Sequence, residues 1–262
     1  MDYLALNKKN WNDRTDVHYQ SDFYNVPAFI AGRNSLKTIE LDLLGDIKGK
    51  KLLHLQCHFG QDTISLSRLG AEVTGIDFSE KAIQRAKELA QLTQSTTRFM
   101  LSDVYGLKSV LNESFDLVFT SYGTIGWLPD IKQWAEVVSH FLRPGGTFVF
   151  AEFHPVIWML SSDFKKIEYR YFNDEPIVEE SEVTYTDGAM PGKSKTVGWN
   201  HGLAEVIQAL IDQGLTLSVF QEFDYSPFNC FDNMVEVAPD KFQVKGIEGK
   251  IPMIYALKAM KK

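Results

Sequence analysis

The stretch Leu52–Gly60, with the sequence LLHLQCHFG, decides the fold, because a short apolar run ends there in polar residues and a glycine. Lys51–Gln56 follows a Lys-Gly-Lys-Lys turn, and this pattern predicts a buried strand. Gly60–Gly70 carries apolar residues at helical spacing, and Ala71–Ile76 is a second apolar run. A strand, a helix and another strand in this order predict parallel strands joined by a right-handed crossover.

The same alternation continues as far as Phe153. Ser79 is a typical N-cap for a helix that we expect to reach about Gln94. The remaining elements expected here are strands at Thr97–Leu101, Phe115–Thr120 and Thr147–Phe153, a helix from Pro129 to Leu142, and a turn at Arg143-Pro144-Gly145-Gly146. Together they predict an α/β fold with a doubly wound sheet.

The chain outside this stretch predicts a different local structure. Residues 1–50 are rich in aromatic side chains, and we expect them to form an N-terminal helical lid. Between His154 and Asn200, short runs at Glu168–Phe172 and Glu182–Thr186 and turn residues at Asp187-Gly188 and Pro191-Gly192 predict an antiparallel β insert on the rim of the sheet. The α/β pattern returns with a helix at His201–Gln213 and strands at Leu215–Glu222 and Pro252–Met260.

We therefore expect one domain over residues 1–262. Its parts are the lid (1–50), a ligand-binding core (51–153), the insert on the substrate side (154–200) and the C-terminal part of the sheet (201–262).

Composition excludes several classes of protein. The net charge of −7 and the pI of about 5.4 argue against a nucleic-acid partner, because binding to its phosphates needs a basic protein surface. No apolar run reaches the roughly 18 residues of a membrane span, and Met1–Asn10 has no apolar signal core, so we expect a cytoplasmic protein. Two cysteines, Cys57 and Cys230, are too few for a disulfide framework or a cysteine metal cage.

The residues after the strands indicate a ligand, because ligands of open parallel sheets bind at the carboxyl ends of the strands. Asp77 ends the second strand, where a carboxylate usually binds ribose hydroxyls, and Phe78 could lie against a base. Asp103, with the backbone of Val104, could pair with the amino edge of adenine. These positions fit a cofactor that contains adenosine, although Asp77 also suits the N-terminus of a helix.

The first loop argues against a dinucleotide. It has one glycine, Gly60, with Gln56 and His58 where a G-x-G-x-x-G loop needs more glycine, so it suits a cofactor without phosphates.

A metal site is not expected at this loop. His54, Cys57, His58 and Asp62 are close in sequence, but strand alternation turns some of them to opposite faces, and no second His or Cys cluster completes a site. Cys57 is expected to fill apolar space.

The motifs in this order resemble those of class I S-adenosylmethionine-dependent methyltransferases. The resemblance rests on Leu52–Gly60, Val73–Ser79, Ser102-Asp103-Val104, Phe115–Ser121 and Leu142–Phe150, which begins with the signature Leu-Arg-Pro-Gly-Gly. It implies a Rossmann-like seven-stranded sheet whose last strand is antiparallel. It also implies S-adenosyl-L-methionine as cofactor and methyl transfer, here to a small-molecule acceptor.

The same resemblance implies roles for individual residues. Gln56, Cys57 and Gly60 would line the methionine and ribose end, Asp77 would bind the ribose, Phe78 the adenine face, Asp103 and Val104 the adenine edge, and Ser121 and Tyr122 would lie near the sulfonium. His54 stands where the family usually has an acidic residue. Asp62 either supplies that carboxylate or compensates the dipole of its helix.

Two histidines are candidates for a general base or for positioning the acceptor. His154 follows the fifth strand and His201 begins a helix, so a strand-end hydrogen bond and a helix cap are their structural alternatives. The aromatic side chains of the insert, such as Trp158, Tyr169 and Trp199, suit a pocket for a planar acceptor and equally a packed layer or a homodimer interface. A non-catalytic cofactor-binding protein and a nicotinamide-dependent oxidoreductase are the alternative functions.

Overall fold

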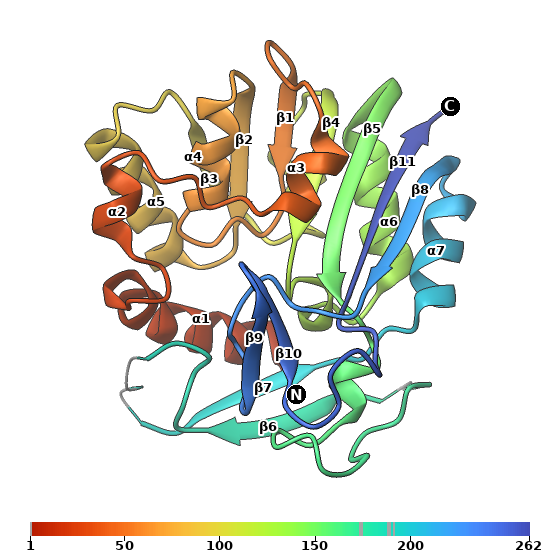
Figure 1. Ribbon diagram of the computed structural model, residues 1–262. Helices are drawn as coiled ribbons and strands as arrows, with labels where there is room; N and C mark the ends of the chain where they lie inside the picture. Colours follow the sequence, from red (N-terminus) through yellow and green to blue (C-terminus); the bar gives the residue numbers. More distant parts are fainter. Residues whose placement is uncertain (1, 173–174, 188–189, 191) are drawn as a thin grey trace.

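A seven-stranded sheet forms the centre of the computed structural model, which describes residues 2–172, 175–187, 190 and 192–262 (Figure 1). Its strands are β1 (Lys51–His54), β2 (Glu72–Asp77), β3 (Arg98–Leu101), β4 (Phe115–Ser121), β5 (Leu142–Phe153), β8 (Leu215–Phe223) and β11 (Ile254–Lys261). They lie in the order β3-β2-β1-β4-β5-β11-β8. Strands β1 to β5 pair in parallel, whereas β11 is antiparallel to both β5 and β8. The predicted doubly wound sheet with an antiparallel last strand is confirmed.

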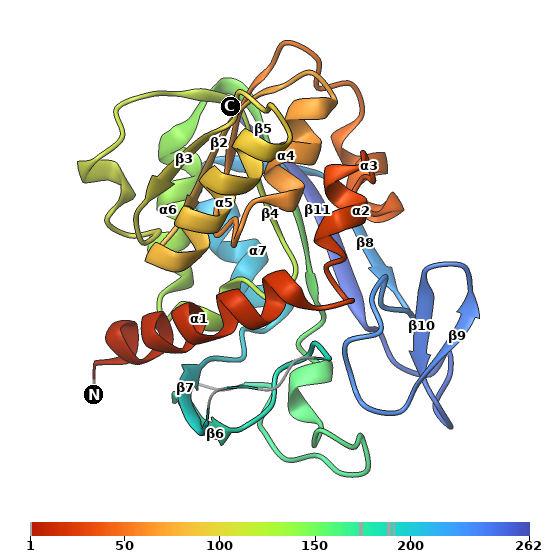
Figure 2. The same cartoon turned by 90° about the vertical axis from the view of Figure 1, so that its left-hand side faces the viewer.

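Helices cover both faces of this sheet, as the two views show (Figures 1 and 2). On one face lie α3 (Thr38–Leu44), α4 (Gln61–Arg68) and α5 (Glu80–Leu92), and on the other α6 (Ile131–Phe141) and α7 (Leu203–Asp212). Neighbouring residues of β1 show the alternation of a buried parallel strand: Leu52 packs in the cluster of Leu66, and Leu53 in the cluster of Trp134. Two short 3₁₀ helices, η1 (Leu107–Ser109) and η2 (Ile125–Trp127), contribute to the core, whereas η3 (Ile157–Met159) packs in a separate cluster with Val244 and Met253.

A second layer lies at the carboxyl ends of the parallel strands (Figure 1). It consists of α1 (Tyr3–Gln20) and two antiparallel hairpins, β6 (Ile177–Ser181) with β7 (Ser194–Gly198) and β9 (Met234–Ala238) with β10 (Lys241–Val244). The short helix α2 (Val26–Ile30) packs instead against α4 and α5 of the core. The predicted helical N-terminus and antiparallel insert are confirmed. The insert hairpin is a separate sheet rather than an extension of the rim, and the hairpin β9–β10 was not predicted.

The predicted strands inside the insert are misplaced. Neither Glu168–Phe172 nor Glu182–Thr186 forms a strand. In Glu168–Phe172 the tyrosine side chains form hydrogen bonds instead: the Tyr169 hydroxyl donates to Glu179 at 2.8 Å, and the Tyr171 hydroxyl accepts from the Leu203 amide at 3.1 Å. Of the predicted turn residues, Gly188 and Pro191 lie outside the described residues.

Two boundaries near β5 also differ from the prediction. Pro129 does not begin a helix; Asp130 caps α6 instead, because its side chain accepts from the Gln133 amide. Arg143–Gly146 is not a turn between elements but a bulge inside β5, since Leu142 lies opposite Phe115 and Thr147 opposite Leu117.

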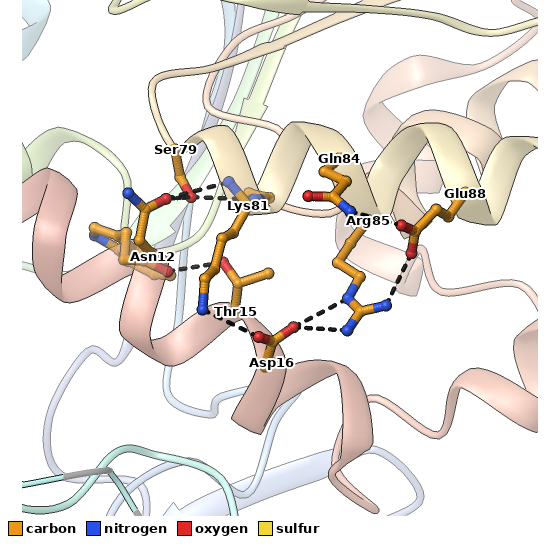
Figure 3. A network of polar contacts seen from close by, with 10 residues as sticks. Asn12, Thr15, Asp16, Ser79, Lys81, Gln84, Arg85 and Glu88 are labelled. Atoms are coloured by element: carbon orange, nitrogen blue, oxygen red, sulfur yellow. Dashed lines mark hydrogen bonds and ion pairs between the residues drawn. The ribbon is translucent and has the colours of Figure 1, made fainter.

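Polar side chains hold α1 between the core and the insert, and Figure 3 shows those that join α1 to α5. Asn12 Oδ1 accepts from the Ser79 hydroxyl at 2.7 Å and from the Lys81 amide at 3.2 Å, at the start of α5. Asp16 pairs with Arg85 at 2.8 Å, further along α5. On the other side, Asn7 exchanges two hydrogen bonds with the backbone of Val197 in β7. The lid is therefore fixed by hydrogen bonds rather than by an apolar helix face.

Among the described residues, no helix is both long and apolar enough to cross a membrane.

Gly60 is expected to tolerate no side chain. Its φ is +82°, and an added Cβ would lie 2.5 Å from Cζ of Phe99. Gly60→Ala should therefore lower the free energy of unfolding by about 3 kcal/mol, the sum of left-handed strain and overpacking, measured by urea denaturation. Gly49→Ala is the control, because φ is +73° and nothing lies within 4 Å. Gly49→Ala should lower the free energy of unfolding by about 1 kcal/mol. Equal losses of stability in the two variants would show that the added Cβ at position 60 does not clash with Phe99.

Asn12→Ala should loosen α1 without unfolding the core. Three hydrogen bonds to residues 79–81 are lost, so hydrogen–deuterium exchange over residues 3–20 should rise while exchange in β1 and β4 stays unchanged. Asp13→Ala, which removes only the exposed pair with Lys9, serves as the control. Identical exchange of α1 in the two variants would contradict this view of the lid.

Candidate functional site

Two adjoining cavities lie between the carboxyl ends of the strands and the second layer. The smaller has a volume of about 30 Å³ and the larger about 780 Å³. Gln56, Phe78 and Trp127 line both, so the two cavities meet at these side chains. Most of the predicted site residues lie here, as expected for residues that follow parallel strands.

The loop after β1 has the backbone of a glycine-rich loop without its glycines. Gln56 and His58 have φ values of 54° and 49°, in the left-handed region that glycine adopts most easily. Gln56 Nε2 donates to the Thr124 carbonyl at 2.8 Å, which ties this loop to the loop after β4. Gln56 Oε1 and His58 Nε2 are buried in the cavity wall without a hydrogen-bond partner among the described residues. Unsatisfied buried polar atoms of this kind fit a bound polar ligand.

Asp77 lies at the centre of the site and holds two loops. One carboxylate oxygen accepts from the His58 amide and the other from the Ser79 amide, both at 2.9 Å. Burial raises the pKa of Asp77 to about 6, although these backbone N–H groups act in the opposite direction. Ser79 is the N-cap of α5, as predicted. Asp77 therefore both begins the helix and faces the large cavity, so the two interpretations of the sequence are compatible.

The smaller cavity combines the residues predicted to bind adenine. Phe78, Asp103 and Val104 line it, together with Tyr3 and Asn7 from α1. Asp103 Oδ1 accepts from the Gly106 amide at 2.8 Å, which fixes the carboxylate at the cavity wall. An aromatic face and a carboxylate suit a planar heterocycle with an amino group. A ring of that size needs more room than about 30 Å³, so Tyr3 and Asn7 of α1 would have to move aside for it to enter.

The loop after β4 is held by a buried carboxylate that the sequence did not single out. Glu152, in β5, accepts from the amides of Gly123, Thr124 and Ile125 and from the Thr124 hydroxyl. Glu152 is 2% exposed and lines the large cavity. Its hydrogen bonds fix the backbone just after Ser121 and Tyr122, both of which line the same cavity.

Tyr122 links this loop to the N-terminal segment. Its hydroxyl donates to Glu40 Oε2 at 2.6 Å, and Glu40, in α3, is 1% exposed. Burial raises the pKa of Glu40 to about 7. The pair places an ionisable carboxylate behind a phenol that faces the cavity.

The two histidine candidates are engaged elsewhere. His154 lies outside both cavities, since its Nε2 pairs with Glu222 of β8 at 2.9 Å and its Nδ1 accepts from the Val156 amide. His201 lines the large cavity, but its Nε2 contacts the Leu128 carbonyl at 2.7 Å and its Nδ1 contacts Glu205 at 3.2 Å. Neither ring has a free nitrogen. The hydrogen bond expected at a strand end is present for His154, whereas His201 does not cap a helix, because Gly202 is the N-cap of α7 and no side chain caps it.

The remaining loop residues are packed or paired. Cys57 is buried against Gly75 in a core cluster, as expected for an apolar filler, although it also touches the cavity. His54 Nδ1 contacts the Thr63 hydroxyl at 2.9 Å. Burial raises the pKa of Asp62, against the opposing influence of Ser35, Lys37 and Arg33. Within the described residues, no group of three or more His, Cys, Asp or Glu side chains could hold a metal ion.

The face of α1 that covers the cavities was not predicted from the sequence. Tyr3, Asn7, Trp11, Arg14 and His18 recur every three or four residues, which places them on one face of a helix. Tyr3 and Asn7 line the small cavity, and Trp11 and Arg14 the large one. His18 lies against the ring of His58, 5.3 Å between centroids. The spacing was visible, but a stripe of polar and aromatic residues is not the apolar pattern of a packed helix.

His54 is expected to make stability depend on pH. Burial lowers its folded-state pKa to about 3, below the ordinary 6.5, so the unfolded chain binds a proton that the folded chain does not between these values. Stability contributed by neutral His54 is thus lost as pH falls below about 6.5. From pH 7 to pH 5 the wild type should lose about 2 kcal/mol more than His54→Gln, measured by urea denaturation. Equal losses would mean that His54 is not buried in its neutral form.

Comparison with known proteins agrees with this geometry. Residues 52–146 match the family model of a methyltransferase domain. Over 135 residues the chain is 33% identical to an uncharacterized methyltransferase of Synechocystis, covering 50% of this chain and 60% of that protein. Over 125 residues it is 30% identical to a ubiquinone biosynthesis O-methyltransferase of Coxiella burnetii, covering 48% of this chain and 52% of that protein. The chain thus spans little more than half the length of these curated relatives.

A solved structure shares the fold over a longer stretch. The S-adenosylmethionine-dependent methyltransferase of Mesorhizobium loti aligns with a TM-score of 0.58 and 20% identity, covering 88% of this chain and all of that chain. At this identity the similarity concerns the fold alone.

Proposed function

Because residues 52–146 match the family model of a methyltransferase domain, we propose that the protein transfers a methyl group from S-adenosyl-L-methionine to a small-molecule acceptor. The observation that carries the proposal is the junction of the two cavities. A slot lined by Phe78, Asp103 and Val104 opens beside the buried carboxylate of Asp77 into a larger, aromatic space. An adenosine and a reacting group need these two compartments side by side.

The residues present fit the cofactor. Phe78, Asp103 and Val104 would hold adenine, and Asp77 would accept from the ribose hydroxyls. Gln56 Oε1, an unsatisfied buried acceptor, suits the ammonium of the methionine part, which compensates for His54 in the place of an acidic residue. Asp62, in the same wall, adds a carboxylate there. When bound, the cofactor supplies a methyl group already activated by the sulfonium.

The protein would then contribute alignment and exclusion of water. The loop of Ser121, Tyr122 and Gly123 is held rigid by Glu152, so its atoms can orient an acceptor at small entropic cost. Because the Tyr122 hydroxyl donates a hydrogen bond to Glu40, its oxygen can still accept a hydrogen bond from the group that becomes methylated. No side chain at the cavity has to activate the methyl group itself.

The acceptor side favours a small molecule. Trp158, Tyr169 and Trp199, with Phe153 and Phe231, line the part of the large cavity that the insert and the hairpin β9–β10 enclose. Aromatic walls of this kind suit a planar or apolar molecule. The net charge of −7 disfavours a nucleic-acid acceptor.

The cofactor proposal predicts that Asp77→Asn weakens binding of S-adenosylhomocysteine by about tenfold or more, since hydrogen bonds to a charged carboxylate are lost. Isothermal titration calorimetry measures this. Glu72→Gln, at the exposed opposite end of the same strand, should bind like the wild type. If the folded wild type binds no S-adenosylhomocysteine, or if Asp77→Asn leaves its affinity unchanged, the proposed site is wrong.

The acceptor proposal predicts where the methyl group goes. Incubation of the protein with methyl-labelled S-adenosylmethionine and a bacterial extract should yield a new labelled small molecule in the ultrafiltrate, separated by chromatography from the labelled cofactor. The same incubation without the protein is the control. Label confined to the protein or nucleic-acid fraction would contradict a small-molecule acceptor.

A further inference from the structure

Arg14 is a half-buried cation that the protein does not neutralise. It lies on the face of α1 that lines the large cavity, and its Nε is buried without a hydrogen-bond partner. No hydrogen bond or ion pair joins the guanidinium to any other group in residues 2–172, 175–187, 190 and 192–262. The groups that act on its charge through space are Glu179 and the phenols of Tyr24 and Tyr185, and none of them forms an ion pair with it.

Two tryptophans hold the guanidinium in place. Its carbon lies 5.5 Å from the centroid of the Trp11 ring and 5.8 Å from that of Trp127. Contacts with aromatic rings orient a guanidinium but use none of its five N–H donors. The two ring contacts therefore orient Arg14 and leave its N–H groups free to donate to a ligand.

The other cations of the cavity wall are already engaged. Arg33 donates to the Tyr24 carbonyl, and Lys37 pairs with Asp240 at 2.9 Å. Arg14 is thus the one Arg or Lys of the described wall that lacks a protein acceptor. A charged group removed from water without a partner is costly, and a ligand anion would offset that cost.

We propose that Arg14 binds the carboxylate of a ligand in the large cavity, through the paired N–H groups of its guanidinium. The planar fork matches a carboxylate in geometry. A singly charged anion fits better than a dianion such as phosphate, because only one free cation faces a wall that also carries acidic side chains, namely Asp62, Asp77, Glu152, Glu168, Glu179 and Asp232.

Two molecules could bring this carboxylate. One is the amino-acid part of the cofactor, and this source rests on the proposed function. The other is an acceptor that combines a carboxylate with an aromatic frame, for which the neighbouring rings are suited. The chemistry at Arg14 is the same in both cases, so matched pairs of ligands separate them.

The test uses calorimetry on the full chain with two such pairs. S-adenosylhomocysteine and 5′-methylthioadenosine differ by the amino-acid part, and benzoate and benzamide differ by the charge. Arg14→Gln should reduce the preference of the wild type for the carboxylate member of at least one pair by about tenfold or more. Arg14→Lys keeps the charge without the fork and should give an intermediate loss. Arg143→Gln, which removes an arginine paired with Asp116 outside the cavity, should keep the wild-type preference.

A change in the first pair assigns the carboxylate to the cofactor, and a change in the second assigns it to the acceptor. If Arg14→Gln, folded as judged by circular dichroism, leaves both preferences within twofold of the wild type, the proposal is overturned. The benzoate pair is measured with and without S-adenosylhomocysteine. Failure of the wild type to bind either nucleoside therefore removes the proposed function while the role of Arg14 is still decided by the second pair.

Discussion

The hydrogen bonds of the Asp77 carboxylate are the interaction on which the site depends. One oxygen holds the loop after β1 through the His58 amide, and the other starts α5 through the Ser79 amide. The loop after β1 has left-handed residues that are not glycine, so it needs such an external hold to keep its shape. Asn12 of α1 then binds to the same helix start, which places the lid over the cavities. The buried Asp77 carboxylate thus joins the end of β2 to the loop after β1 and to the start of α5, and α1 binds to the same helix start.

The two layers of the molecule are stabilised by different forces. The sheet and its helices bury apolar side chains on both faces, which gives a close-packed core. The lid instead buries polar residues such as Asn7, Thr15 and His18 and is joined to α5 and β7 by hydrogen bonds. Because Asn7 and His18 are buried, loss of a hydrogen-bond partner would leave a polar group unsatisfied, so these bonds fix the position of α1 over the core.

The core was predictable because its signals are local. The capping of α5 by Ser79 and the alternation of strands and helices follow from short stretches of sequence, and parallel pairing then brings Asp77, Asp103 and Tyr122 to one edge. The partner of His154 could not be foreseen, because Glu222 is 68 residues away and meets it only through the pairing of β8 with β11. The covering face of α1 was missed because it lacks an apolar stripe. The hairpin β9–β10 was missed although its sequence carries a signal: the apolar-rich runs Met234–Ala238 and Lys241–Val244 flank the turn residues Pro239-Asp240.

The central claim is that the paired cavities hold an adenosyl cofactor over the carboxyl ends of β1, β2 and β3. A crystal structure of the protein with S-adenosylhomocysteine tests it most directly. We predict adenine in the small cavity between Phe78 and the Asp103–Val104 backbone, the ribose hydroxyls on Asp77, and the sulfur facing Tyr122. Adenine bound elsewhere, or a ribose that does not contact Asp77 in a fully occupied complex, would contradict the account.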